Sequence, residues 1–96
     1  MPSFRVIVAV GRLQPGVDPR DVEPRAADAA RELAVVEASS VDVVSGEARI
    51  TVRFTEDNPR TALRVAEHTV ARLSTVAELG PWRLTERVGG RWYRRA

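Results

Sequence analysis

The chain has 96 residues, of which 44% are hydrophobic and 29% charged, which is the size and composition of one folded domain. The absence of cysteine excludes disulfides, thiolate chemistry and Cys-ligated metal sites, and it favours a cytoplasmic location. All 15 basic residues are arginine, yet the formal net charge is only +2, so charge alone does not predict nucleic-acid binding.

The amino-terminal half predicts a strand and then a helix. Apolar and mixed residues alternate over residues 4–11, as in a strand with one buried face. This segment follows no charged leader, and its apolar run is too short to cross a bilayer, so neither a signal peptide nor a membrane span is expected. After turn signals at 15–19, Asp21 is the expected N-cap of a helix that runs to about Ala38. Its apolar stripe consists of Val22, Ala26, Ala29, Leu33 and Val36.

The remaining elements follow in the same way. Residues 41–44 and 48–54 predict two strands joined by a turn at Ser45-Gly46. Asn58-Pro59 marks the start of a second helix, which carries the second apolar stripe at Leu63, Ala66, Val70, Leu73 and Ala77. Gly80-Pro81 is expected to end that unit. Residues 82–88 and 91–95 then form a hairpin about Gly89-Gly90.

This order predicts a single ferredoxin-like α+β domain over residues 1–96, a split βαβ unit (βαββαβ) with a C-terminal hairpin strand. Two helices with one apolar stripe each can both pack on one face of an antiparallel sheet. The other face of the sheet is then open to solvent or to a partner.

The open face is the candidate binding surface. Strand alternation places five arginines on it, and a two-residue turn at Gly89-Gly90 sets Arg87 opposite Trp92 and Thr85 opposite Arg94. The predicted binding residues are Arg5, Arg49, Arg53, Arg83, Arg87 and Trp92.

The open face suits either an anionic partner or a second copy of the chain. An anionic partner or small ligand would meet the guanidinium groups, but nucleic acid is disfavoured because the central strands lack the aromatic residues of RNA-binding sheets. The favoured occupant is a second copy of the chain, which forms a homodimer in which arginines pair with Glu47, Asp42 or Glu86.

No residue pattern predicts catalysis, a metal site or a cofactor. His68 is the only histidine, and the helical wheel places it towards solvent without a positioned partner. The acidic residues cluster at the two helix starts, where they complement the helix dipole. There is no nucleophile elbow and no glycine-rich phosphate loop.

Two segments carry a family resemblance. Gln14-Pro15-Gly16-Val17 and Gly46-Glu47-Ala48-Arg49-Ile50-Thr51-Val52 resemble the turn after the first strand and the third strand of ACT-type regulatory domains. That resemblance implies an amino-acid ligand at a subunit interface. The likeness to dimeric α+β-barrel oxygenases is one of fold alone.

The sequence therefore favours a non-catalytic, self-associating binding or assembly module that uses the arginine-rich open face. The alternatives are an ACT-like domain that binds a regulatory small ligand and a nucleic-acid-binding protein.

Overall fold

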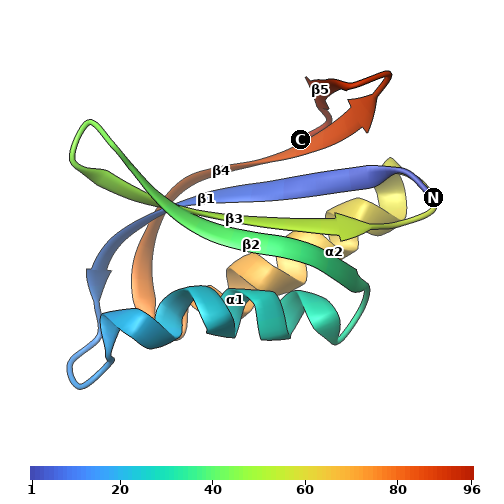
Figure 1. Ribbon diagram of the computed structural model, residues 1–96. Helices are drawn as coiled ribbons and strands as arrows, with labels where there is room; N and C mark the ends of the chain where they lie inside the picture. Colours follow the sequence, from blue (N-terminus) through green and yellow to red (C-terminus); the bar gives the residue numbers. More distant parts are fainter.

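The computed structural model describes residues 1–96 as a five-stranded antiparallel sheet with two helices on one side (Figure 1). The elements are β1 (Ser3–Leu13), the short 3-10 helix η1 (Pro19–Asp21), α1 (Val22–Arg31), β2 (Val35–Val44), β3 (Glu47–Thr55), α2 (Pro59–Leu73), β4 (Ala77–Val88) and β5 (Arg91–Arg94). The strand order is β2-β3-β1-β4-β5. The predicted ferredoxin-like fold with its extra hairpin strand is confirmed.

The core lies between the helices and the central strands β1 and β3. Phe4 and Phe54 lie side by side with ring centroids 6.0 Å apart, and both are fully buried. Small residues on α1 and α2 let the helices approach this layer, and Ala26, Ala30, Ala62 and Ala66 are all completely buried. Burial of each bulky side chain contributes about 1.5–3 kcal/mol, so this layer supplies the main stabilisation.

The first helix is shorter than predicted. It ends at Arg31 instead of about Ala38, and β2 begins at Val35 instead of 41. Val35 and Val36 pair with Thr55 and Phe54 of β3, because β-branched side chains suit a pleated strand better than the last turn of a helix. Leu33, placed in the predicted stripe, is 51% exposed in the turn between the two elements.

The fourth strand is longer than predicted. It starts at Ala77 and continues through Gly80-Pro81, which was expected to be a break. The pairing of β1 with β4 shifts register between Val8 and Val10, and β5 pairs only with residues 85–88. Pro81 therefore lies where the neighbouring strands require no backbone donor from it.

The start of the second helix is as predicted. Asn58 Oδ1 accepts a hydrogen bond of 3.0 Å from the Thr61 backbone N–H, and Pro59 occupies the first helical position. Asp21 precedes α1 but makes no side-chain capping bond, whereas Asp18 caps η1. Neither helix combines the length and the apolar character that a membrane crossing requires.

Candidate functional site

The sheet face opposite the helices brings together most of the predicted binding residues. Arg5 on β1 lies beside Arg53 on β3 and Thr85 on β4, and Ile7 lies beside Arg83. The predicted register of the C-terminal hairpin is confirmed, because Arg87 pairs with Trp92 and Thr85 with Arg94. The hairpin thus carries an aromatic ring to the side of the sheet where the arginines lie.

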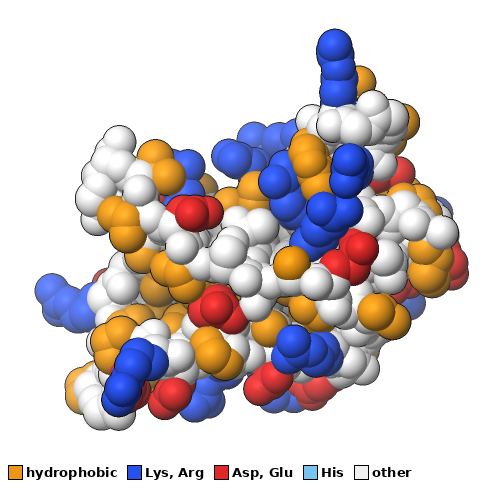
Figure 2. Space-filling view, viewed as in Figure 1, with side chains coloured by type: hydrophobic (Ala, Val, Ile, Leu, Met, Phe, Trp, Pro, Cys, Tyr) orange, Lys and Arg blue, Asp and Glu red, His pale blue; other side chains and the backbone are white.

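Trp92 packs directly against two of these arginines. The guanidinium carbon of Arg5 lies 3.7 Å from the centroid of the Trp92 ring, and that of Arg53 lies 5.3 Å away. Figure 2 shows basic side chains gathered below the β4–β5 hairpin, with hydrophobic surface among them. Stacking on an aromatic face orients a guanidinium group and leaves its N–H edge available for other partners.

Positive charge in this cluster is poorly compensated. The pKa of Arg5 is lowered, first by burial and then by the neighbouring charges of Arg53, Arg83 and Arg87. The buried Nε of Arg5 has no hydrogen-bond partner among the protein atoms. The cluster therefore combines mutual repulsion with an unused, partly desolvated donor.

Glu37 is the carboxylate that the structure pairs with this cluster. Its Oε1 accepts hydrogen bonds from the Ser3 hydroxyl at 2.7 Å and from Arg53 Nε at 3.3 Å. The pKa of Glu37 is lowered, mainly by the Ser3 hydrogen bond and also by Arg53 and Arg87. Sequence reasoning missed Glu37 because it placed this residue in a helix, not on the edge strand.

A hollow of about 150 Å³ adjoins the cluster. Ile7 and Ala9 form its floor on β1, and Arg83 belongs to both the hollow and the charged cluster. Arg49 lines this hollow instead of joining the cluster, and its Nε lies 3.5 Å from a carboxylate oxygen of Glu47. Glu47 lines the hollow as well, and the other lining residues are Pro81, Trp82 and Arg94.

The predicted residues therefore fall into two groups. Arg5 and the four residues that surround it form the charged cluster: Arg5, Arg53, Arg83, Arg87 and Trp92. Arg49 lies at the adjoining hollow. Arg94 also lines the hollow. The predicted register placed it on this face, but the predicted binding residues did not include it.

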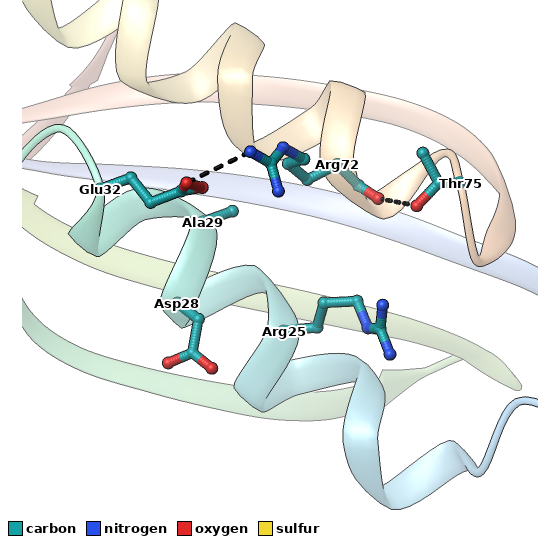
Figure 3. Close-up of a pocket in the computed structure, with 6 residues that line it drawn as sticks. All are labelled: Arg25, Asp28, Ala29, Glu32, Arg72 and Thr75. Atoms are coloured by element: carbon teal, nitrogen blue, oxygen red, sulfur yellow. Dashed lines mark hydrogen bonds and ion pairs between the residues drawn. The ribbon is translucent and has the colours of Figure 1, made fainter.

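A second hollow, of about 290 Å³, lies between the two helices (Figure 3). Among its charged residues, Glu32 and Arg72 pair with each other, Asp28 pairs with Arg31 outside the hollow, and Arg25 forms no ion pair. Glu32 accepts hydrogen bonds from Arg72 at 3.2 Å and contacts His68 Nε2 at 3.1 Å, while Asp28 pairs with Arg31 at 2.9 Å. In the close-up, Glu32 and Arg72 point towards each other across the gap between the helices, whereas Arg25 and Asp28 point away from this pair.

His68 is not the solvent-facing residue that the helical wheel predicted. Its side chain is 27% exposed and contacts Glu32, because α1 packs against α2 and Glu32 lies at the C-terminal end of α1. Glu32, at the end of α1, therefore connects the two helices through its contacts with His68 and Arg72 on α2. No group of three or more His, Cys, Asp or Glu side chains is arranged to hold a metal ion.

Comparisons with known proteins identify no family for the chain. No protein-family model matches it. No curated protein matches it either, so the ACT-type resemblance gains no support. One solved structure with a similar fold is provisionally described as an antibiotic biosynthesis monooxygenase from Chloroflexus aurantiacus. The identity is 18% and the TM-score 0.47, and the match covers 93% of this chain and 96% of the other.

The description of that neighbour contradicts our prediction of a non-catalytic self-associating module, because it names an enzyme. We withdraw that prediction, and the ACT-like and nucleic-acid alternatives fare no better. The likeness itself assigns no activity to this chain, so the functional argument must come from the site.

Proposed function

We propose that the chain recognises a small organic anion on the open face of its sheet, at the arginine cluster and the adjoining hollow. The observation that carries this proposal is Arg5, a partly buried guanidinium whose Nε lacks a partner and which three other arginines surround. A carboxylate bound at the cluster would offset the repulsion among these arginines and accept hydrogen bonds from their accessible guanidinium N–H groups.

The shape of the site favours a small molecule. The hollow of about 150 Å³ has Ile7 and Ala9 on β1 and is bordered by three guanidinium groups and the Glu47 carboxylate, so it suits a ligand of few atoms held by a few polar contacts. Arg83 lies between the hollow and the cluster, so one anionic group there could reach both parts.

Binding can be measured by isothermal titration calorimetry with citrate as the probe. We expect Arg83→Gln to weaken citrate binding about tenfold, since one charge-assisted hydrogen bond contributes about 1.5 kcal/mol. Arg64→Gln, on the exposed side of α2, is the matched control and should bind as the wild type does. Equal affinities of the two variants, or no binding by the wild-type chain, would refute the proposal.

A separate assay tests whether the bound anion is a substrate. Because the structural neighbour is described as a monooxygenase, oxygen consumption is the first turnover to measure with any anion that binds. The binding proposal does not depend on the outcome of that assay.

Two sequence-based predictions remain open. The homodimer through this face would cover the same arginines and compete with anion binding, so light scattering with and without citrate tests it. We expect the dimer fraction to fall as citrate is added. The cytoplasmic location, argued from the cysteine-free composition, is checked by fractionation of the source cells.

A further inference from the structure

The open face changes character along β1. Its side chains run from the charged Arg5 through the branched Ile7 to the small Ala9, at every second residue of the strand. The surface therefore descends from a cluster of positive charge into an apolar hollow. A ligand that uses the whole site needs an anionic group at one end and an apolar body at the other.

The hollow, here called the slot, lies over β1 and is bordered by residues of β3 and β4. Arg49 on β3 lies beside Ala9, and Arg83 on β4 lies beside Ile7. Because neighbouring strands are about 4.8 Å apart, the backbones that carry these two arginines are about 10 Å apart across β1. Pro81 and Trp82 lie on the β4 side of the slot, but Trp82 packs against the core, so the walls on the open face are guanidinium groups, Pro81 and the Glu47 carboxylate.

The floor of the slot depends on small residues. A Cβ atom at Gly80 would lie 3.1 Å from the Cβ of Ala9, closer than carbon atoms normally pack. Gly80 lines the neighbouring hollow of about 570 Å³, which shares Ala9 with the slot, so a side chain at Gly80 would crowd the Ala9 end of the slot from outside. The slot therefore opens at this end onto surface that small residues line.

We infer that the ligand of this site is a flat aromatic carboxylate, an inference that rests on the proposed anion-binding function. A planar ring can lie over Ile7 and Ala9 with its faces towards the walls, since guanidinium groups stack on aromatic faces. Its carboxylate then lies at the Arg83 end, where the planar fork of a guanidinium matches the two oxygens of a carboxylate.

The probes are benzoate, cyclohexanecarboxylate, acetate and inorganic phosphate, each titrated by calorimetry at one pH and ionic strength. The three carboxylates have the same charge and differ in the body that the slot must accept. We expect benzoate to bind at least about tenfold more tightly than acetate, the smallest discrimination that one methylene gives in an apolar pocket. Benzoate should also bind more tightly than cyclohexanecarboxylate, whose ring is not flat.

A substitution in the floor of the slot distinguishes the contribution of the ligand's ring to binding from that of its carboxylate. Ile7→Ala should weaken benzoate binding about tenfold and acetate binding by a much smaller factor, because it removes apolar contact with the ring without altering any arginine. Leu33→Ala is the control, since Leu33 is exposed and lies between α1 and β2. Circular dichroism shows whether Ile7→Ala folds, and Ile7 is only half-buried.

The outcomes distinguish the two proposals. Equal affinities for benzoate and acetate, both lost in Arg83→Gln, would overturn the aromatic ligand and leave the anion site standing. Tighter binding of phosphate than of benzoate would also overturn it and indicate a phosphate ligand. No binding of any probe would refute both proposals.

Discussion

Replacement of Arg5 by methionine should make the protein more stable, although Arg5 is the centre of the proposed site. Methionine keeps the unbranched apolar stem and removes a charged group whose buried Nε has no partner. An unsatisfied buried donor costs about 1–3 kcal/mol, and repulsion from neighbouring arginines adds to this cost. The lost stacking on Trp92 offsets about 0.5–1 kcal/mol.

The expected net gain is about 1 kcal/mol, or about 4–8 °C in Tm for a domain of this size. Differential scanning calorimetry at low ionic strength measures it, and Arg64→Met on the exposed side of α2 should shift stability by less than about 0.5 kcal/mol. Added salt should stabilise the wild type more than Arg5→Met, because salt screens repulsion among arginines. A fall in Tm for Arg5→Met beyond that of the control would show that Arg5 stabilises the sheet, and the reasoning would fail.

Three further predictions concern the same face of the sheet. Thr85→Val should raise the free energy of unfolding by about 1 kcal/mol, because the buried Thr85 hydroxyl has no hydrogen-bond partner and valine has nearly the same shape. Urea titrations measure this change. A loss of stability would indicate that the hydroxyl has an acceptor. Gly80→Ala should lower the free energy of unfolding by about 1–3 kcal/mol, because the added methyl group overpacks against Ala9. The double variant Gly80→Ala with Ala9→Gly should recover most of the lost stability. Strictly additive losses in the two single variants would argue against this contact. Glu37→Gln should be less stable than wild type near neutral pH, because the folded state lowers the pKa of Glu37, chiefly through Ser3. The stability from that carboxylate is present above its unfolded pKa of about 4.3 and is lost as the pH falls through the lower folded pKa, so the difference should shrink in acid. A difference that does not change with pH would contradict this account.

The largest error in the sequence analysis is the boundary between α1 and β2, and it has a single cause. A stripe at spacings of three and four continues from Val22 to Val36, and only tertiary contacts show that it changes from helix to strand near residue 33. Val35 and Val36 pair with β3, and this pairing outweighs a helical periodicity that the sequence permits equally well. The same shift moved Glu37 to the charged cluster, and the packing of α1 on α2 set Glu32 against His68; the sequence predicted neither contact.

The sequence by itself determined the fold class, the faces of the strands and the register of the C-terminal hairpin. These depend on local rules, namely the period of two in a strand, the Asn58-Pro59 helix start and the two-residue turn at Gly89-Gly90. Only the tertiary structure decided which charges meet, because contacts such as Arg5 on Trp92 join residues far apart in the chain. The separation of the arginines into a cluster and a hollow follows from the packing of β1 between β3 and β4, and no local pattern encodes it.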